Sequence, residues 1–237
     1  MKLRTNIIGF GLLIGCILGC GGSSIGDLPD PNVRLINFCT DANLDLLIDD
    51  ESQFTNIAFL DDTTVFKKTE SKLEDFAIQE TGSTVILDSQ TQTMSKDTDN
   101  LVIGLGLKTF GLETEKRLRF IFQPVNRAIP NGSKARVYGI NTFVRDIGNQ
   151  NFAVIFKNPG TVSTINFNPV NFAEVTVQEI DAGPVTLVAQ RQNTETVVAT
   201  VTKTFEAGKI YLMALTGTES GTGVNVPAIN FIEIPTR

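Results

Sequence analysis

The second half of the chain alternates hydrophobic and polar residues in short runs, and this pattern predicts β-strands. The runs are rich in β-branched and aromatic residues, which favour an extended backbone. Gly, Pro and Asn separate them at intervals of roughly ten residues, as in an antiparallel β-sandwich. The runs are FAVIFK (152–157), EVTVQEI (174–180), VTLVAQ (185–190), TVVATVTKTF (196–205) and IYLMAL (210–215). We therefore predict an all-β fold.

One stretch of the first half, KKTESKLEDFAIQE (67–80), is ambiguous by itself. Its residues favour a short helix by propensity, but its apolar positions fit neither the helical nor the strand period well. An internal repeat favours a strand there, because the stretch matches NFAEVTVQEI (171–180) in the second half.

The repeat runs through the whole chain. A constant order of matches with small changes of spacing indicates tandem domains that differ in loop length. The boundary falls in NRAIPNGS (126–133), which has the composition of a linker, so we predict two β-sandwich domains at 33–126 and 133–237. The matches are NVRLINF (32–38) with KARVYGI (134–140) and Ile78 with Ile180, each 102 positions apart, and Leu105-Gly106 with Thr216-Gly217 and LRFI (118–121) with INFI (229–232), each 111 positions apart.

The N-terminus has the layout of a secretory signal peptide. A basic start, MKLRTN, precedes an apolar run from Ile7 to Leu18, which is short for a transmembrane span. Ile17-Leu18-Gly19-Cys20 resembles the lipobox of bacterial lipoproteins, in which the cysteine is lipidated and the chain is cut before it. The sequence thus predicts a signal peptide (1–19), lipidation with fatty acids such as palmitate at Cys20, and a lipidated tether (20–32).

A second segment, Leu13-Ile14-Gly15-Cys16, also fits the lipobox. We favour Cys20, because a cut at Cys16 shortens the apolar run and leaves apolar residues in the tether. Residue 21 is glycine rather than aspartate, so the resemblance to bacterial lipoproteins implies sorting to the outer membrane in a bacterium with two membranes. The remaining cysteine, Cys39, lies in an alternating segment and is expected to be a buried structural thiol.

Composition narrows the function classes. The net charge is −6, and removal of Lys2 and Arg4 with the signal peptide makes it more negative, which disfavours nucleic acid as a partner. The sequence contains no histidine, so the hydrolases that use an imidazole as base or metal ligand are disfavoured. It also contains no tryptophan and only two tyrosines, which leaves little for a sugar-binding platform.

The segment VRLINFCTDANLDLLIDD (33–50) resembles the opening of the bacterial domain-of-unknown-function 4397 family. Further similar segments are EIDAGPVTLVA (179–189), TFEAGKIYLMALTG (204–217) and GSKARVYGI (132–140), and together they cover nearly all of residues 31 to 237. The resemblance implies an immunoglobulin-like sandwich in an exported or envelope protein. The first copy departs from the family at Asn37-Phe38-Cys39-Thr40, where a His-Ala-Ser-Pro loop is typical.

Three residues of the second copy have expected structural roles. Gly183 and Gly208 suit tight turns that require a positive φ. Tyr211, three residues after Gly208, is placed to return its hydroxyl to the backbone, as the tyrosine corner of such sandwiches does.

Candidate chemistry is sparse. Asp41-Ala-Asn43-Leu-Asp45 begins like a calcium loop, but Leu46 stands where glycine is needed and Glu51 comes one position early, so we predict no metal site. Other acidic clusters lie at 49–51, 61–62 and 97–99, and an enzyme would have to use pairs such as Asp49 with Asp61. The glycine-rich stretch 217–223 lacks the lysine of a phosphate loop and is expected to be a mobile connector.

These observations favour a non-catalytic envelope lipoprotein without cofactors. It would be attached to the membrane by lipid and would serve as a structural, adhesive or protein-interaction module with an envelope protein as its partner. The alternative is a small-ligand or ion-binding lipoprotein, with Asp41, Asn43 and Asp45 as its candidate residues.

Overall fold

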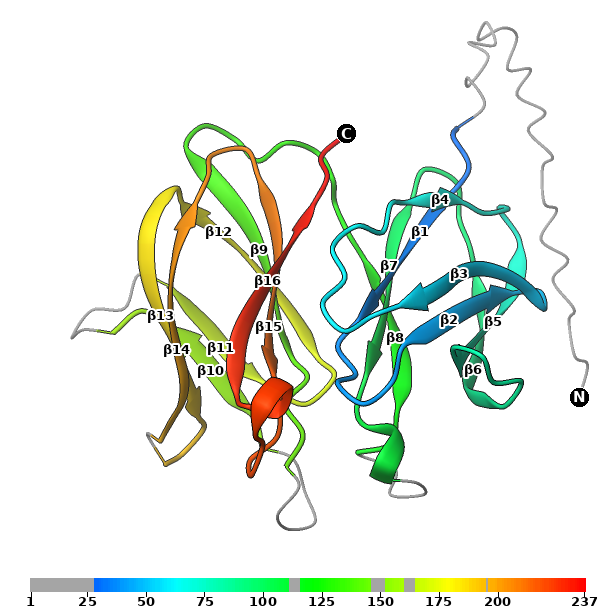
Figure 1. Cartoon of the computed structure of the whole chain (residues 1–237). Coiled ribbons are helices and arrows are strands. Elements are labelled where there is room, and N and C mark those ends of the chain that lie inside the picture. The colour runs from blue at the N-terminus through cyan, green and yellow to red at the C-terminus, as the bar shows by residue number, and fades with distance from the viewer. Residues whose placement is uncertain (1–27, 111–115, 146–151, 160–164, 195) are drawn as a thin grey trace, which may run out of the picture.

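The computed structural model describes residues 28–110, 116–145, 152–159, 165–194 and 196–237. Almost all regular structure in these residues is β, which confirms the predicted fold class (Figure 1). Two single-turn 3-10 helices, Lys108–Phe110 and Gly223–Asn225, interrupt the strands. The first eight strands are β1 (Asn32–Asn37), β2 (Leu44–Ile48), β3 (Glu51–Ile57), β4 (Lys67–Lys68), β5 (Leu73–Glu80), β6 (Ile86–Thr93), β7 (Asp99–Leu105) and β8 (Arg119–Pro124).

These eight strands form two four-stranded sheets, in the orders β4-β1-β7-β8 and β3-β2-β5-β6. Neighbouring strands are antiparallel except β1 and β7, which run parallel over six residue pairs from Asn32–Asp99 to Asn37–Gly104. The facing sides of the two sheets enclose one apolar core that includes Leu46, Phe76 and Phe120. We call this unit the first sandwich.

The second half repeats this arrangement strand for strand. Its sheets have the orders β12-β9-β15-β16 and β11-β10-β13-β14, so each strand takes the place of the strand eight positions earlier. β9 and β15 are again parallel, and a separate core includes Phe156, Phe167 and Phe205. The strands of this second sandwich are β9 (Lys134–Asn141), β10 (Val154–Lys157), β11 (Asn166–Val170), β12 (Val175–Asp181), β13 (Gly183–Arg191), β14 (Val197–Phe205), β15 (Ile210–Thr216) and β16 (Ala228–Ile234).

The strand order differs in detail from the immunoglobulin arrangement. Constant-type immunoglobulin domains divide seven strands into sheets of four and three. Here eight strands divide four and four, with the first strand beside the seventh. The two units share the sandwich architecture of immunoglobulin domains but not their strand order.

An asparagine fixes the true register between the two copies. The Asn37 side chain donates to the carbonyls of Ala42 and Ile57 and accepts from the Cys39 N–H. Asn141 makes the same three contacts, with Phe152, Val170 and Phe143. The first strands therefore match at a spacing of 104 positions, and the predicted match of 32–38 with 134–140 is wrong by two residues.

Other predicted matches have mixed outcomes. The spacing of 111 holds for β7 and β15, where Gly106 and Gly217 both have positive φ, but β8 and β16 match at 109 by their pairing with those strands. Residues 73–80 are a strand, as predicted. The match of Ile78 with Ile180 is wrong, because β5 corresponds to β13 and β12 corresponds to the two-residue edge strand β4.

Candidate functional site

The first candidate functional feature is a joint between the two sandwiches. The sheets β4-β1-β7-β8 and β12-β9-β15-β16, which we call the inner sheets, face each other across a third apolar core (Figure 1). Matching positions of the two copies supply this core, including Ile36 with Ile140 and Leu101 with Leu212. The joint therefore has the character of a twofold interface between two copies of one unit.

Arg34 of β1 is the polar centre of the joint in the first sandwich. It is 1% exposed, and its guanidinium donates to the Glu233 carbonyl of the second sandwich at 2.9 Å. It also donates to the Asp62 carbonyl and the Thr64 hydroxyl, both at 3.0 Å. Burial lowers the pKa of Arg34, and the nearby Asp62 carboxylate opposes this effect. Hydrogen bonds to three acceptors compensate the charge for its removal from water.

Tyr138 of β9 occupies the position that matches Arg34. Its hydroxyl accepts a hydrogen bond at 2.9 Å from the N–H of Asn126, which follows the last strand of the first sandwich. Arg34 and Tyr138 thus each reach from the first strand of one sandwich to the last strand of the other, or just beyond it. Sequence reasoning missed both residues, although the shared Ile-Asn of VRLIN (33–37) and VYGIN (137–141) marks their equivalence.

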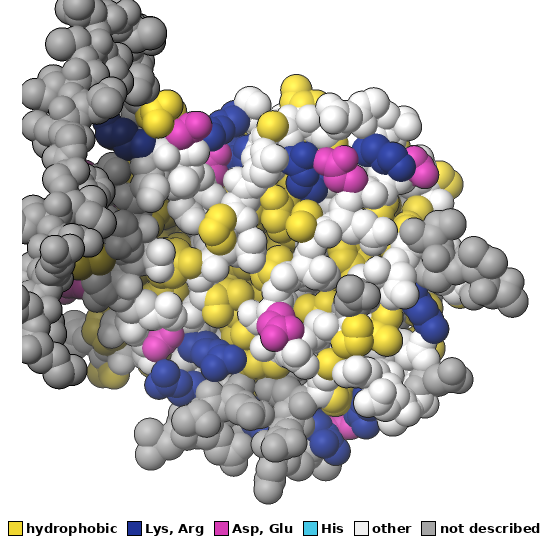
Figure 2. Space-filling view, turned by 180° about the vertical axis from the view of Figure 1, so that it is seen from behind, with side chains coloured by type: hydrophobic (Ala, Val, Ile, Leu, Met, Phe, Trp, Pro, Cys, Tyr) yellow, Lys and Arg dark blue, Asp and Glu magenta, His cyan; other side chains and the backbone are white. Residues whose placement is uncertain are grey.

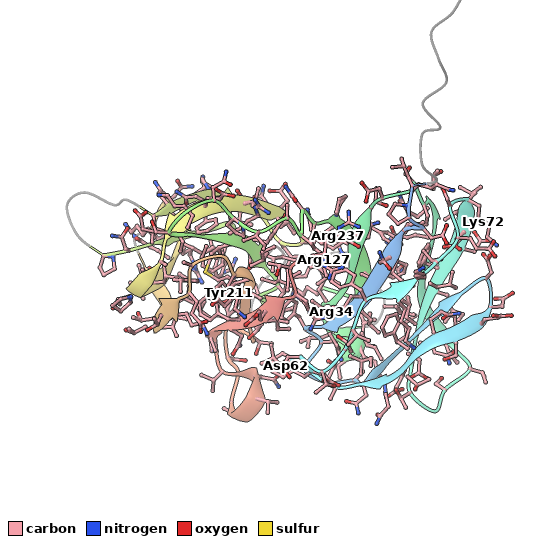
Figure 3. All side chains as sticks on the ribbon, turned by 90° about the horizontal axis from the view of Figure 1, so that it is seen from above. Arg34, Asp62, Lys72, Arg127, Tyr211 and Arg237 are labelled. Carbon is pink, nitrogen blue, oxygen red and sulfur yellow. The ribbon has the colours of Figure 1, made fainter. Side chains whose placement is uncertain are left out.

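The C-terminus closes the joint at one end. The Arg237 guanidinium lies 2.8 Å from the Asp97 carboxylate and 3.2 Å from the buried Asp99 carboxylate. Asp99 also accepts from Asn32 and pairs with Arg127, whose side chain lies over the Phe66 ring. Figure 3 shows Arg34, Arg127 and Arg237 between the two sandwiches. The predicted acidic cluster 97–99 therefore serves as an interdomain ion-pair site.

The segment before β1, the linker between the sandwiches and the C-terminus all lie at this end, which we call the entry end. The Pro29 carbonyl accepts from the Asp97 N–H, the linker 125–133 crosses between the sandwiches, and the C-terminus lies above them (Figure 1). Loops of both sandwiches lie at the opposite end, which we call the loop end. They include 38–43, 81–85 and 217–227. The molecule thus has two chemically distinct ends.

The acidic cluster 49–51 forms a hairpin turn. Asp49 and Asp50 connect β2 to β3, and both have positive φ (49° and 64°), as a two-residue type I′ turn requires. The Asp49 carboxylate accepts from the Asp75 N–H and lies 3.0 Å from the Lys72 ammonium. The hydrogen bonds from the Asp75 N–H and the Lys72 ammonium lower the pKa of Asp49. The bonds from Lys72 to Glu70 and then to Asp49 raise the pKa of Lys72.

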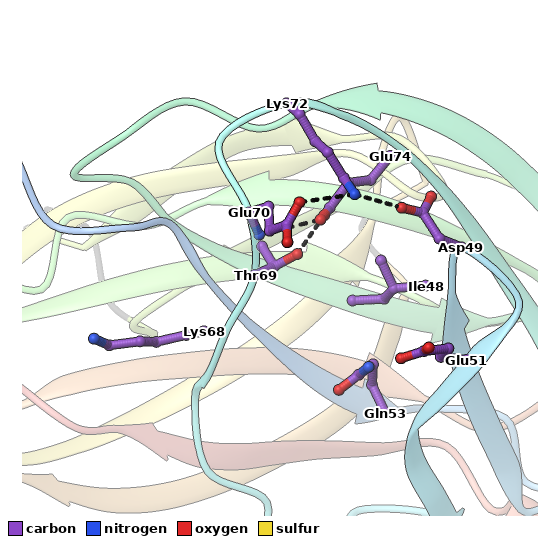
Figure 4. A pocket seen from close by; sticks show the side chains of 9 residues that line it. All are labelled: Ile48, Asp49, Glu51, Gln53, Lys68, Thr69, Glu70, Lys72 and Glu74. Carbon is purple, nitrogen blue, oxygen red and sulfur yellow. Dashed lines mark hydrogen bonds and ion pairs between the residues drawn. The ribbon is translucent and has the colours of Figure 1, made fainter.

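A pocket of about 340 Å³ lies beside this hairpin (Figure 4). Lys72 bridges two of the carboxylates that line it, Asp49 and Glu70, at 3.0 and 2.8 Å. The buried Glu74 carboxylate accepts from the Thr69 hydroxyl and the Glu70 N–H. These internal bonds make Lys72 and its carboxylate partners a structural cluster on one side of the pocket.

Asp49 and Asp61, the pair considered for catalysis, belong to two different local structures. Asp61 accepts from the N–H and the hydroxyl of Thr63 in the loop after β3, whereas Asp49 belongs to the β2–β3 hairpin. Each carboxylate is thus engaged by its own neighbours.

The three candidate calcium ligands also serve different local structures. Asp41 accepts from the Cys39 thiol at 2.9 Å and from the backbone N–H groups of Lys108 and Thr109 at 3.0 Å. Asp45 accepts from the Asn56 N–H and the Thr81 hydroxyl, and Asn43 donates to the Asn56 side chain. Among the described residues, no group of three or more Cys, Asp or Glu side chains is arranged to hold a metal ion.

Cys39 is free and fully buried. Burial and the Asp41 carboxylate together raise the pKa of its thiol. The pKa of Asp41 is lowered. Burial opposes the ionisation of this carboxyl, but the hydrogen bonds from Cys39, Lys108 and Thr109 outweigh burial and hold its pKa below the ordinary value. The thiol is therefore an inert structural donor, as expected from the sequence.

The turn residues of the second sandwich lie where the strands change direction. Gly183 (φ 135°) joins β12 to β13, which belong to different sheets, and Gly208 (φ 77°) precedes β15. The Tyr211 hydroxyl accepts from the Glu206 N–H at 3.3 Å, and burial raises its pKa.

The glycine-rich stretch 217–223 is folded against its neighbours. Glu219 pairs with Arg145 at 3.1 Å and with Arg191, so one carboxylate ties the loop to two other segments. A Cβ atom on Gly221 would lie 1.8 Å from the Asn225 carbonyl oxygen, which explains a glycine there.

No family model matches the chain, and no curated protein matches it. The resemblance to the domain-of-unknown-function 4397 family stays a prediction. Cys16, Cys20 and the predicted signal peptide lie outside the described residues. Within the part of the chain that the structure describes, no helix is long and apolar enough to cross a membrane.

Proposed function

We propose that this chain is a non-catalytic cell-envelope lipoprotein that presents a rigid two-sandwich module to an envelope protein. Cys20 carries the lipid, and the membrane is the outer one where the organism has two. The tether attaches the entry end of the module, and the loop end carries the surface for the partner.

The observation that carries this proposal is the face-to-face joint of the inner sheets. A buried apolar core, the Arg34 hydrogen bonds and the Arg237 ion pairs hold the two sandwiches in one orientation. A rigid module holds its free end in a fixed orientation relative to its attached end, as a scaffold or an adhesin requires. An enzyme would instead require convergent reactive groups, and the candidate carboxylates serve separate hairpins, loops and ion pairs.

The surface also fits a protein partner better than a nucleic acid. Lys and Arg side chains alternate with Asp and Glu along one edge of the molecule (Figure 2). At the entry end, Lys134 pairs with Asp181 and Lys209 pairs with Glu233. Nucleic acid binding needs a clustered basic surface, so this mixed surface disfavours nucleic acid as the partner.

Fatty-acid labelling of cells tests the lipid anchor. We expect labelled palmitate to be incorporated into the wild type and the Cys16→Ser variant, and to be lost in Cys20→Ala. In a bacterium with two membranes, the wild type should fractionate with the outer membrane. Labelling that persists in Cys20→Ala would overturn the assignment.

Site-specific photo-crosslinking tests the partner surface. A photoreactive residue replaces Val85 or Val224 at the loop end, or Ile129 at the entry end, three positions with exposures of 64%, 65% and 64%. We expect one discrete crosslinked envelope protein from the loop-end positions and not from Ile129. Recovery should use an antibody, because a C-terminal tag would follow Arg237 and disturb its ion pairs. Equal crosslinking from all three positions would contradict a partner surface at the loop end.

A further inference from the structure

The first strand of the described chain is placed where a tethered module receives tension. β1 begins four residues after Leu28, the first described residue, and runs from the entry end toward the loop end (Figure 1). It lies inside its sheet, with β7 on one side and β4 on the other. A pull on the tether therefore acts on β1 before any other strand.

The geometry of this pull matters because the hydrogen bonds of the parallel β1–β7 ladder are evenly spaced and run across the strands at a slant rather than along them. A force along β1 that is resisted at the loop end loads all six residue pairs with β7 at once, which is a shear geometry. A force that separates two strands from one end instead breaks the pairs in succession. Shear therefore requires a much larger force than peeling for the same number of bonds.

Side chains hold β1 at three levels. At its start, Asn32 donates to the buried Asp99 carboxylate at 2.9 Å. Near its start, Arg34 binds the backbone of the second sandwich, and at its end Asn37 binds the Ala42 and Ile57 carbonyls. Displacement of β1 along its axis breaks these bonds together with the β-ladder.

Arg34 also connects β1 to the second sandwich, so that force on β1 acts on both sandwiches. Its partner Glu233 belongs to β16, on the other side of the joint, so force on β1 passes directly to the second sandwich. The matching strand β9 has no tether, because it follows the linker between the sandwiches. Only the first copy is therefore placed to take this load from the tether.

We propose that β1 is a mechanical clamp that carries tension from the lipid anchor into both sandwiches. This inference rests on the proposed function, since the anchor supplies the tension. The function assigned here is load bearing: the strand keeps the module folded while its partner and the membrane pull on opposite ends.

Single-molecule pulling on the full chain in mild detergent tests this inference. The chain is produced without lipidation, so the Cys20 thiol is free and is one handle. Cys16 is replaced by serine, and the second handle is the introduced thiol of Val85→Cys, Val224→Cys or Ile129→Cys. These three positions have nearly equal exposure, and the buried Cys39 stays unlabelled. Cys20 with Val85 or Val224 loads β1 in shear, whereas Cys20 with Ile129 pulls on two points of the entry end.

We expect a high-force unfolding event for the Val85 and Val224 handles and its loss for the Ile129 handle. Arg34→Lys, which keeps the charge but loses the forked contacts, should lower the force for the Val224 handle. Arg117→Lys is the matched control, because Arg117 is 44% exposed at its side chain, contacts Asp88 and should leave the force unchanged.

Equal unfolding forces for all three handle pairs would overturn the clamp. The pulling measurement contains no membrane, so that result would leave the lipid anchor intact as a proposal. Conversely, loss of the anchor in the labelling experiment would remove the source of tension while the measured forces stayed the same. The two failures are therefore distinguishable.

Discussion

At the scale of single residues, Arg34 shows how a buried charge can join two domains. Its contacts are backbone carbonyls and a hydroxyl, while the Asp62 carboxylate acts at longer range. A removal of the guanidinium would leave those acceptors buried without their donor, which is the costly way to lose hydrogen bonds.

We expect Arg34→Leu to lower the free energy of unfolding by roughly 2–4 kcal/mol, the range for loss of a buried hydrogen-bond network. Urea denaturation measures this change. Arg117→Leu, which removes an exposed ion pair, should cost less than about 1 kcal/mol. Similar losses in the two variants would show that the joint does not depend on Arg34.

Asp41 predicts a pH dependence with a definite sign. Its folded-state pKa lies below the ordinary value of about 3.9, so its carboxylate stabilises the fold above that pH. The contribution is lost as the pH falls through the folded-state pKa. We expect the stability difference between wild type and Asp41→Asn to be constant from neutral pH to about 5 and to shrink below about 4. Denaturation at a series of pH values measures it, with Asn43→Ala as a variant without a titrating group.

The same residues predict no response to calcium. Asp41 and Asp45 already accept hydrogen bonds from the protein, and an ion would have to displace those donors. We expect the melting temperature to be unchanged by millimolar calcium. A rise of several degrees that is absent in Asp41→Ala would establish a site.

At the scale of elements, the β2–β3 hairpin is an unusual use of acidic residues. A type I′ turn needs positive φ at both central positions, and aspartate tolerates this better than most residues but less well than glycine. Both residues are exposed, and Asp49 also accepts a hydrogen bond from the Asp75 N–H. Turn chemistry thus accounts for the two aspartates at 49 and 50.

We expect Asp50→Gly to stabilise the protein by about 0.5–1 kcal/mol, because glycine removes the strain of a left-handed backbone. Asp50→Val should destabilise it, since a β-branched side chain is poorly accommodated at φ 64°. Thermal unfolding of both variants measures the two signs. Changes of the same sign would contradict the assigned turn.

The length of the edge strands also belongs to this scale. β12 has seven residues and its counterpart β4 has two, because the chain before β4 runs past the joint and offers Asp62 and Thr64 to Arg34. The two copies therefore share their inner strands and differ at their edges, where the loops serve the joint.

At the scale of the whole molecule, the joint should make the two sandwiches unfold as one unit. Its core is as fully buried as the cores inside the sandwiches. Unfolding of one sandwich would expose the joint face of the other, which couples their stabilities.

We expect one calorimetric transition for the wild type and two for the variant with Leu101→Ala and Leu212→Ala, which weakens the joint from both sides. Each substitution removes a fully buried leucine at a cost of about 2–4 kcal/mol. The matched control replaces Leu46 and Leu187, one in each separate core, and should keep a single transition at lower temperature. Two transitions in the wild type would show that the joint couples the sandwiches only weakly.

The sequence was sufficient for the local features of the fold. Alternation with a period of two and turn residues such as Gly183 and Gly208 act over a few positions, so they predicted the strands and the tandem repeat. The register between the two copies could not be predicted from the same pattern. A shift of two residues keeps every side chain on the same face, so the pattern of NVRLINF fits 134–140 as well as the true match at 136–142.

The joint was decided by tertiary structure, although the sequence contains a signal for it. The runs LVIGL (101–105) and IYLMAL (210–215) are nearly continuous in apolar residues, as in strands of sheets that are covered on both faces. The structure agrees, because every residue of β7 and β15 is buried. The partners of these faces lie far away along the chain: Arg34 and Glu233 are 199 positions apart. Local pattern determined the strands and the two units, because turn chemistry and alternation act between neighbours. Only the folded chain determined which faces, charges and loops meet, because those contacts join residues that the sequence does not place near each other.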